Sequence, residues 1–180
     1  SNIYLHEVLD AWFYRHARPL VGGRCELVRF ADDFVILCER KEDAERFFKG
    51  IYPRFEKFGL MLHPEKTKLV PFKRPPRGGP NESESWSFLG FLHYWSKSRK
   101  GSWVVFRKTD PKRLNRALRA VGDWCRKHRH HPVKWQHSIL SMKIRGHCEY
   151  FGITGNSIAL EKFRCGVRNL WRKWLRRRSG

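Results

Sequence analysis

The feature that most constrains the fold of this chain is a pair of adjacent carboxylates, Asp32 and Asp33, between two apolar runs. The flanking residues 26–30 and 34–38 are rich in aromatic and β-branched side chains, which favour strands. Only a two-residue turn, at Ala31-Asp32 or a neighbouring pair, is left between the two runs. The sequence therefore predicts a tight β-hairpin that carries two carboxylates at its tip.

Side-by-side carboxylates repel each other, so an ordinary hairpin would avoid them unless a cation bound there. Hard divalent cations prefer oxygen ligands and keep several waters, which suits one or two carboxylates on a rigid turn. Enzymes that transfer phosphoryl groups with two metal ions use carboxylates in this way. We therefore expect Asp32 and Asp33 to bind Mg²⁺ or Mn²⁺. The alternative is a solvated turn, because aspartate is common in turns.

The charge of the chain is strongly positive and unevenly distributed. The net charge is +21; residues 1–98 carry 16 Lys and Arg against 13 Asp and Glu, whereas residues 99–180 carry 22 against 4. Such an excess in one half predicts a polyanionic partner, most often nucleic acid. A weaker alternative is that residues 156–178 form a basic amphipathic helix on a membrane surface or a calmodulin-like partner. We expect no membrane partner, because no apolar run approaches the roughly 20 residues that span a bilayer.

The cysteines predict structural thiols in a reducing compartment. Their number is odd and they form no C-x-x-C motif: they are Cys25, Cys38, Cys125, Cys148 and Cys165. The first residues also lack a basic start followed by an apolar stretch, so we expect an intracellular, cytoplasmic protein. A bacterial source is a separate expectation.

A zinc site is a further alternative near Cys125. His128, His130 and His131 follow it closely, but no second ligand pair comes at finger-like distance. The basic surroundings also oppose a dication, so we do not expect zinc there.

Apolar periodicity and turn residues predict an α+β fold, with a strand-rich first part and a helical second part. Pro53 is expected to kink or shorten the second helix. Asp110 or Thr109 and Asn156 are expected to cap two later helices. The expected helices cover 3–13, 41–58, a segment from 110, 133–150 and a segment from 156; the strands cover 60–62, 67–70, 86–94 and 103–106; a mobile loop covers 73–85.

Two of these helices show clear buried stripes. In the segment 41–58 the apolar positions are Ala44, Phe47, Phe48, Ile51 and Phe55. The apolar positions of the last helix are Ile158, Phe163, Val167, Leu170, Trp171 and Trp174. We place the last two tryptophans in the helix core rather than on an RNA-binding face.

Several motifs in the first half occur in the order seen in reverse transcriptases. They resemble most closely the group II intron reverse transcriptase/maturase family. These motifs are Ser1-Asn2-Ile3-Tyr4-Leu5, Phe30-Ala31-Asp32-Asp33, Gly59-Leu60-x-Leu62-His63-Pro64-Glu65-Lys66-Thr67-Lys68 and Phe88-Leu89-Gly90-Phe91.

The second half resembles the maturase-specific thumb domain of the same family. The resemblance implies a partial reverse-transcriptase palm over 1–95 and a basic helical thumb over 96–180. The matching residues are Arg107-Lys108-Thr109, Leu140, Ile144-Arg145-Gly146-His147, Tyr150-Phe151-Gly152, Gly155-Asn156, Trp171 and Leu175-Arg176-Arg177-Arg178-Ser179.

The resemblance implies an RNA-directed DNA polymerase that also assists the splicing and mobility of its own intron RNA, a mobile element. Asp32 would be a direct metal ligand with Asp33 in support, and Lys66 would donate a proton to the leaving pyrophosphate. The alternative for Lys66 is a surface lysine on a strand. Phe30 replaces the tyrosine more usual in the family and keeps the ring beside the primer end.

The resemblance and the charge pattern together predict the nucleic-acid contacts. Phe88, Leu89 and Gly90 would form the primer grip, where glycine permits close approach of the backbone to the primer. RNA template, intron RNA and DNA primer are the expected partners. The basic residues expected to contact nucleic acid, besides the ring of Phe30, are Arg107, Lys108, Lys112, Arg113, Arg116, Lys143, Arg145, Arg164, Arg168, Arg172 and Arg176.

A second metal-binding carboxylate from an earlier palm strand has no candidate before Asp32. Glu7 and Asp10 fall on the opening helix, and Glu26 is beside the hairpin. We therefore expect the fingers and early palm to be supplied by a preceding part of the same polypeptide, and the chain alone not to polymerise. The alternative function is a non-catalytic, maturase-like module that binds folded RNA.

Overall fold

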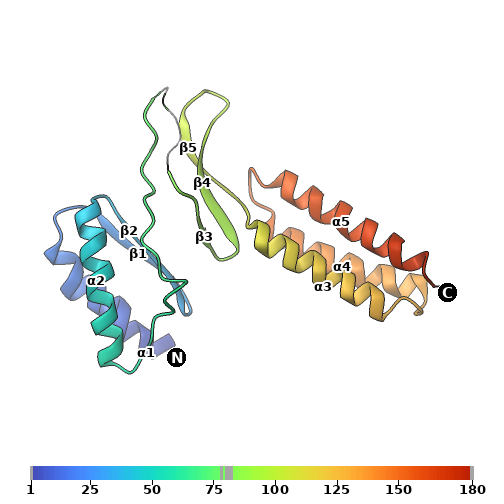
Figure 1. Cartoon of the computed structure of the whole chain (residues 1–180), viewed down its shortest axis with the longest axis horizontal. Coiled ribbons are helices and arrows are strands. Elements are labelled where there is room, and N and C mark those ends of the chain that lie inside the picture. The colour runs from blue at the N-terminus through green and yellow to red at the C-terminus, as the bar shows by residue number, and fades with distance from the viewer. Residues whose placement is uncertain (1, 78, 80–82, 179–180) are drawn as a thin grey trace. The chain divides into compact units, whose positions relative to one another are not determined.

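The structure of the chain is a computed structural model that describes residues 2–77, 79 and 83–178 (Figure 1). Ser1 and Ser179 of the motifs above, and part of the loop predicted over 73–85, lie outside the described residues. Helices and two small antiparallel sheets make an α+β fold, as predicted. The chain divides into two compact units, Ser1–Lys73 and Arg74–Gly180, which are described separately. The domain boundary predicted at residue 95 stays a prediction.

The predicted carboxylate hairpin is present in the first unit. Strand β1, Cys25–Phe30, pairs antiparallel with β2, Asp33–Cys38, and Phe30 lies opposite Asp33. Ala31 and Asp32 are thus the two turn residues, as expected. Ala31 has a φ of 54°, which is unfavourable for a residue with a Cβ atom, so the turn must be held by its surroundings.

The opening segment is helical but less regular than predicted. Helix α1, Asn2–Leu5, continues through the π-helical segments η1, His6–Ala11, and η2, Phe13–Ala17, to a 3₁₀ turn η3, Arg18–Leu20. Periodicity near 3.6 cannot reveal such widened turns, because π-helical turns differ from α-helical ones by one residue. Helix α2, Lys41–Lys57, continues past Pro53, which does not shorten it.

The core of the first unit joins the opening helix, the hairpin and α2. One buried cluster contains Val8, Leu9, Ile51 and Phe55. A second contains Phe13, Cys25 and Phe47, with Cys38 packed against it. The predicted stripe on α2 is therefore confirmed at Phe47, Ile51 and Phe55, whereas Ala44 and Phe48 are half-buried.

The strand pair predicted over 60–62 and 67–70 is wrong. Both segments are described, and neither forms a strand. Leu60 and Leu62 pack against the first cluster, so their alternation reflects burial of alternate side chains. An apolar alternation without a hydrogen-bonding partner does not make a sheet.

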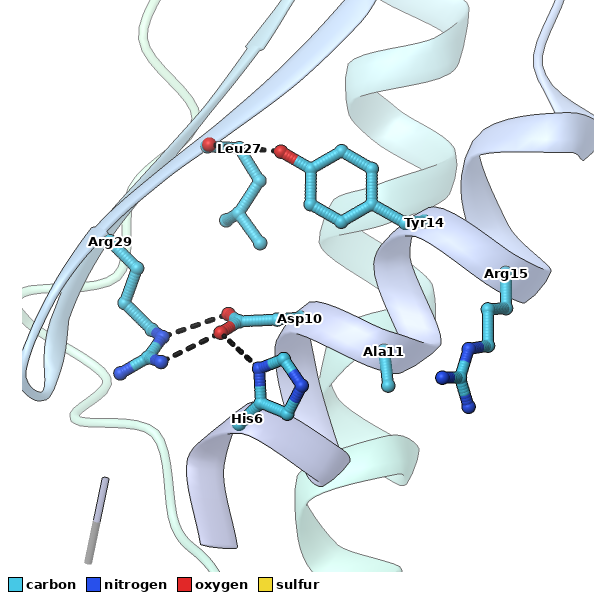
Figure 2. Close-up of a pocket in the computed structure, with 7 residues that line it drawn as sticks. All are labelled: His6, Asp10, Ala11, Tyr14, Arg15, Leu27 and Arg29. Carbon is cyan, nitrogen blue, oxygen red and sulfur yellow. Dashed lines mark hydrogen bonds and ion pairs between the residues drawn. The ribbon is translucent and has the colours of Figure 1, made fainter. Parts of the chain in front are cut away.

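An ion pair connects the opening helix to the hairpin (Figure 2). Asp10 on η1 accepts hydrogen bonds from Nε and Nη2 of Arg29 on β1, at 2.8 and 2.6 Å. Both side chains are only 17% exposed. This bidentate geometry holds the hairpin against the helix more firmly than a single hydrogen bond would.

The aromatic hairpin predicted in the second unit is a three-stranded sheet. Its strands are β3, Trp86–Phe88, β4, Phe91–Lys97, and β5, Trp103–Thr109, in the order β3-β4-β5. The single strand predicted over 86–94 is in fact two strands, because a tight turn at Leu89-Gly90 interrupts it.

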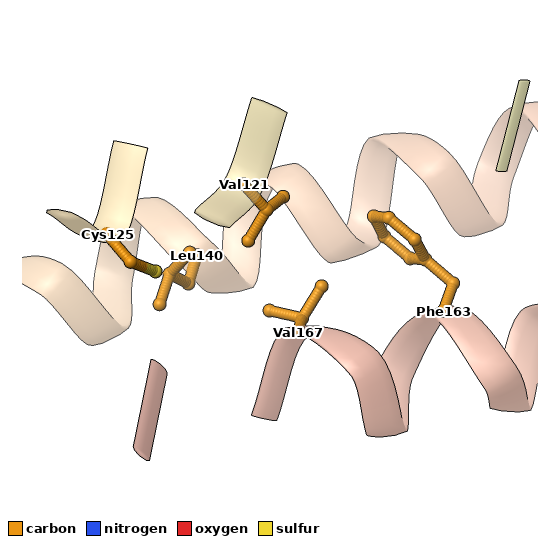
Figure 3. Packing of buried hydrophobic residues seen from close by; sticks show 5 residues of the cluster. All are labelled: Val121, Cys125, Leu140, Phe163 and Val167. Carbon is orange, nitrogen blue, oxygen red and sulfur yellow. The ribbon is translucent and has the colours of Figure 1, made fainter. Parts of the chain in front are cut away.

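Three helices complete the second unit: α3, Pro111–Lys127, α4, Val133–Phe151, and α5, Ser157–Leu175. Their buried core consists of five side chains contributed by all three helices (Figure 3): Val121, Cys125, Leu140, Phe163 and Val167. A Cβ atom on Gly166 would lie 2.6 Å from Cδ2 of Leu118, so glycine permits the close packing of α5 against α3.

The predicted stripe of α5 is confirmed except at its first position. Trp171 and Trp174 pack against the core, as expected. The burial predicted for Ile158 is wrong, because this residue of the first helical turn is 71% exposed. A bilayer-crossing segment is not found among the described helices, which are too polar or too short for one.

The prediction that the Asn156 side chain caps the last helix is also wrong. Asn156 stands at the N-cap position of α5, but its side chain makes no capping hydrogen bond. It is buried, and it binds the backbone N–H of Thr109, the hydroxyl of Thr109 and the carbonyl of Phe151. Asn156 therefore ties the end of β5 to the loop between α4 and α5. Asp110 does cap α3, as predicted, by accepting from the N–H of Lys112.

Candidate metal and nucleic-acid sites

The two carboxylates predicted to bind metal are exposed at the tip of the first hairpin. Asp32 is the second turn residue and Asp33 is the first residue of β2. Neither side chain has a hydrogen bond or ion pair in the described part of the chain. Two free, adjacent carboxylates are oxygen ligands of the kind that Mg²⁺ and Mn²⁺ prefer, so the residues fit such an ion. No group of three or more Asp, Glu, His or Cys side chains that could hold a metal gathers among the described residues.

The turn below these carboxylates is braced from the opening helix. Arg29 donates from Nη1 to the carbonyl of Ala31 at 2.8 Å. Its Nε and Nη2 bind Asp10, as Figure 2 shows. The hydrogen bonds from Arg29 lower the pKa of Asp10 against the opposing effect of burial, and the hydrogen bond with Asp10 raises the pKa of Arg29. Both groups are thus charged at neutral pH. They hold the strained Ala31 and the carboxylate that follows it.

The ion pair also lines an open pocket of about 400 Å³ beside the hairpin. The hydroxyl of Tyr14 donates to the carbonyl of Leu27 at 3.5 Å, and His6 lies 3.2 Å from Asp10. Sequence reasoning missed this cluster. Its members come from segments about 20 positions apart, and no local pattern marks charges that pair through space.

The other residues predicted around the carboxylates are exposed. Phe30, directly before the turn, is 64% exposed, so its ring is free to contact a ligand. Lys66 lies on a turn closed by hydrogen bonds to the carbonyl of His63, at 3.1 Å from its own N–H and 2.9 Å from that of Thr67. Its position is a turn rather than the strand considered above. No hydrogen bond or ion pair joins its ammonium to the described residues.

The segment predicted as the primer grip is the turn between β3 and β4. Phe88 lies opposite Phe91, which leaves Leu89 and Gly90 as turn residues with φ of 50° and 80°. Positive φ at both positions is the geometry of the type I′ turn, which suits the twist of a hairpin. The leucine is an unusual occupant of this conformation, and such strain persists only where surrounding contacts impose it.

Both carbonyls of this turn are held by the helical part of the unit. The hydroxyl of Tyr150 on α4 donates to the Leu89 carbonyl at 2.9 Å. The N–H of Asp110, at the start of α3, donates to the Gly90 carbonyl at 2.9 Å. A Cβ atom on Gly90 would approach Cζ of Phe151 to 3.3 Å, so the turn is also packed tightly against α4.

Asp110 joins the turn to both β3 and α3. Its side chain accepts from the Ser87 hydroxyl and from the Lys112 N–H, the latter at 2.7 Å. Partial burial opposes ionisation, but these hydrogen bonds hold the pKa of Asp110 below its usual value. The sequence marked Asp110 only as a helix cap, and it marked Tyr150 only within a motif. Their contacts with the turn had no local signal.

The basic residues predicted to contact nucleic acid lie at the surface. All are exposed except Lys108, which is half-buried with its ammonium 4.6 Å from the centre of the Tyr94 ring. In the described residues of the helical bundle, 111–178, no ion pair neutralises a cation. Three arginines of α5 and its C-cap arginine follow each other at every fourth position and so share one face of the helix: Arg164, Arg168, Arg172 and Arg176.

Trp124 and Trp135 belong to an aromatic cluster at the turn between α3 and α4. Trp124 stacks on Trp135 at 5.7 Å, and Trp135 stacks on His131 at 4.6 Å. The neighbouring Cys125 is buried in the bundle core, and burial raises its pKa to about 11. A thiol in that setting is a poor zinc ligand.

Comparison with protein-family models identifies the first half of the chain. Residues 1–93 match the family described as reverse transcriptase (RNA-dependent DNA polymerase). The matched range contains the carboxylate hairpin, the turn with Lys66 and the turn at Leu89-Gly90. Neither the comparison with curated proteins nor that with solved structures finds a match.

Proposed function

Because the chain belongs to the reverse transcriptase (RNA-dependent DNA polymerase) family, we propose that it forms the later palm and the thumb of such a polymerase. The observation that carries this proposal is the pair of exposed carboxylates on a braced turn. Asp32 and Asp33 have no partner in the described chain, and an arginine with its own counter-ion holds the turn beneath them. A hairpin that only had to fold would gain nothing from two unpaired like charges.

Each residue near the reaction has a role in this proposal. Asp32 binds the divalent cation directly, and Asp33 supports it. Mg²⁺ bound there would neutralise charge on the transferred phosphoryl group and favour ionisation of the attacking hydroxyl. Lys66 places a proton near the leaving pyrophosphate, since a lysine ammonium is a donor of charge and protons at neutral pH. The ligand set is completed by a carboxylate from outside this chain.

The turn at Leu89-Gly90 positions the primer end in this proposal. Tyr150 and Asp110 occupy the two carbonyls of the turn, so its remaining backbone atoms and the flanking Phe88 are left to contact the primer. Preorganised positioning of this kind lowers the entropic cost of bringing the reacting groups together. The same contacts connect the turn to α3 and α4, which carry several of the basic residues.

The helical bundle binds RNA in this proposal, both as template–primer duplex and as the folded intron of a group II mobile element. Binding to the intron would assist its splicing and mobility. What supports the proposal is the set of exposed cations without counter-ions in the described bundle, because double-helical RNA is recognised chiefly through phosphates and 2′-hydroxyls.

A non-catalytic RNA-binding module is the second candidate. The observation that favours it is that the described chain brings only two adjacent carboxylates to the hairpin tip and gathers no larger ligand group. Such a module would use the bundle alone. It would have no need of Asp32 and Asp33.

The two candidates are separated by primer extension with a polypeptide that joins this chain to an early palm segment. In the joined protein, Asp32→Ala is expected to abolish extension and to change RNA affinity by less than about twofold, since the carboxylate makes no phosphate contact. The control is Asp123→Ala, which removes an exposed carboxylate of α3 and should leave extension intact. Equal loss of extension and RNA binding in Asp32→Ala would show that the carboxylates are structural and would remove the polymerase proposal.

A further inference from the structure

Two cysteines face each other across the base of the carboxylate hairpin. Cys25 on β1 and Cys38 on β2 are direct partners in the register of the two strands. The next pair outward, Arg24 and Glu39, is joined by a backbone hydrogen bond of 2.9 Å from the Glu39 N–H. Hydrogen-bonded and non-hydrogen-bonded pairs alternate in an antiparallel ladder, so the cysteines occupy a non-hydrogen-bonded pair.

This position suits a disulfide. The Cα atoms of a non-hydrogen-bonded pair lie about 4.5 Å apart, with their side chains close together on one face. Disulfides span Cα separations of about 4.4–6.8 Å. The bond therefore requires no rearrangement of the backbone beyond adjustment of the two side chains.

The surroundings place both sulfur atoms on the same, inner face of the hairpin. Cys25 is 1% exposed in a cluster with Phe13 and Phe47, and the half-buried Cys38 packs against that cluster. Burial, with smaller effects from a hydrogen bond with the Cys25 thiol and from Asp43, raises the pKa of Cys38 above its usual value. The two cysteines are thus cross-strand neighbours packed on one cluster, and both thiols are free in the structure.

We propose that Cys25 and Cys38 are an oxidation site, at which a small hydroperoxide converts the two thiols into a disulfide that locks the base of the hairpin. This inference is independent of the polymerase function, because it rests only on the register and packing of β1 and β2. The other cysteines lie on the helices of the second unit and take no part.

The chemistry balances with hydrogen peroxide as the oxidant. The sulfur of Cys38, the more accessible thiol, attacks the peroxide, the O–O bond breaks, and Cys38 becomes a sulfenic acid with release of one water. The sulfur of Cys25 then attacks the Cys38 sulfur, the S–O bond breaks, and the departing hydroxide takes the proton of Cys25 as a second water. Two thiols are oxidised and one peroxide is reduced to two waters.

The disulfide would close residues 25–38 into a covalent loop that contains the turn with Asp32 and Asp33. Opening of the hairpin from its outer end would then be prevented, since cross-linking removes open conformations from the ensemble. The raised pKa of Cys38 keeps its reactive thiolate scarce at neutral pH. The reaction is therefore slow at pH 7 and accelerates as the pH is raised.

The test is oxidation of the folded chain with hydrogen peroxide, alkylation of the remaining thiols with iodoacetamide and peptide mapping by mass spectrometry. The expected product is a peptide pair linked through Cys25 and Cys38 that has lost the mass of two hydrogens, with Cys125 still alkylated after unfolding. The oxidised chain should also unfold at a higher temperature than the reduced chain, and dithiothreitol should reverse both changes.

Two variants sharpen the test. Cys38→Ser should form no intramolecular link, whereas Cys165→Ser, which changes a half-buried cysteine of α5, should form the link as the wild type does. If Cys38→Ser folds poorly, the wild-type peptide map alone still decides. Sulfinic acid on Cys38 with Cys25 free, links that join other cysteines, or oxidation of Cys165 while the hairpin thiols stay reduced would each overturn the proposal.

Discussion

The two units of the chain treat their charges in opposite ways. In the described residues, every ion pair lies in the first unit: Asp10 binds Arg29 and His6, Glu26 binds Arg18 and Arg24, and Glu45 binds Lys41. The helical bundle of the second unit exposes many cations and pairs none of them among its described residues. The paired charges of the first unit thus stabilise the fold, whereas Asp32, Asp33 and Lys66 have no ion-pair partner among the described residues. Charge in the bundle is left for an anionic partner.

This difference indicates where binding of cations and binding of phosphates are expected. An unpaired charge remains available to bind a ligand of opposite charge, whereas a paired charge already interacts with another residue of the protein. By this criterion the hairpin tip is a site for cations and the bundle surface a site for phosphates.

The largest effect is expected from the arginine face of α5. Replacing Arg164, Arg168, Arg172 and Arg176 with alanine should weaken RNA affinity by about two to three orders of magnitude at 0.1 M salt, since each lost phosphate contact flattens the salt slope by about 0.7. Fluorescence anisotropy with a labelled single-stranded RNA measures this change.

The matched control for that variant removes cations that are already paired. Replacing Arg18, Arg24 and Lys41 in the first unit should change RNA affinity by less than about threefold, because each lies in an ion pair and Glu26 and Glu45 offset two of the three charges. Similar losses in the two variants would mean that RNA reads total charge rather than the bundle surface.

The next effect concerns the stability of the first unit. Asp10→Asn removes the counter-ion of Arg29 and should lower the free energy of unfolding by about 2 kcal/mol, because hydrogen bonds to charged groups contribute about 1.5–3 kcal/mol. Urea titration of the unit measures it. The control is Glu45→Gln, which breaks the exposed 3.6 Å pair with Lys41 and should cost less than about 0.5 kcal/mol. Equal costs would show that the pair beneath the hairpin is no stronger than a surface pair.

The same pair predicts a dependence of stability on pH. The pKa of Asp10 is lowered in the folded chain from its ordinary value of 3.8, so its contribution is present at neutral pH and is lost as the pH falls through the folded value. Melting temperatures of wild type and Asp10→Asn should therefore converge as the pH is lowered below 3.8. A gap that stays constant down to the acid transition would contradict the role of the carboxylate charge.

The smallest effect is a gain in stability at the hairpin tip. Asp32→Asn combined with Asp33→Asn relieves repulsion between exposed like charges and should raise the free energy of unfolding by about 0.5 kcal/mol. Differential scanning calorimetry in metal-free buffer measures the gain. Addition of Mn²⁺ should reduce or reverse the difference, because only the wild type has carboxylates to bind it. A loss of stability in metal-free buffer would show that the carboxylates support the turn.

The sequence predicted those parts of the fold that depend on local patterns. The hairpin over 25–38 followed from two β-rich runs around a two-residue turn, and the bundle core followed from stripes such as Phe163, Val167 and Leu170. These signals are strong because burial imposes a period of two on a strand and of about 3.6 on a helix. The carboxylates were recognisable for the same reason, because they interrupt two apolar strand-like runs at the position of the turn.

The parts that failed depend on partners distant in the sequence. Leu60 and Leu62 alternate as in a strand, but no neighbouring strand is there to pair with them. Asn156 has the identity and position of a helix cap, yet Thr109 and the Phe151 carbonyl engage its side chain instead. A local propensity therefore gives the type of interaction that a residue can make. Tertiary structure decides which partner it has.

The candidate sites divide in the same way. Asp32, Lys66 and Gly90 were recognisable from motifs, whereas Arg29, Tyr150 and Asp110, which hold the two turns, were not predicted in that role. Supporting contacts have no fixed spacing, because each depends on the geometry with which separate elements pack. The supporting residues are therefore the ones that only a structure can identify.

The salt dependence of RNA affinity tests the central claim most directly, namely that the unpaired cations of the bundle form a phosphate-binding surface. Affinity of the chain for a single-stranded RNA would be measured from about 50 to 300 mM KCl, for the wild type and for Asp32→Asn combined with Asp33→Asn. If about six phosphates are neutralised, log K should fall with log salt at a slope of about −4, and the slope should be the same in both proteins. A slope near zero in the wild type would contradict the claim.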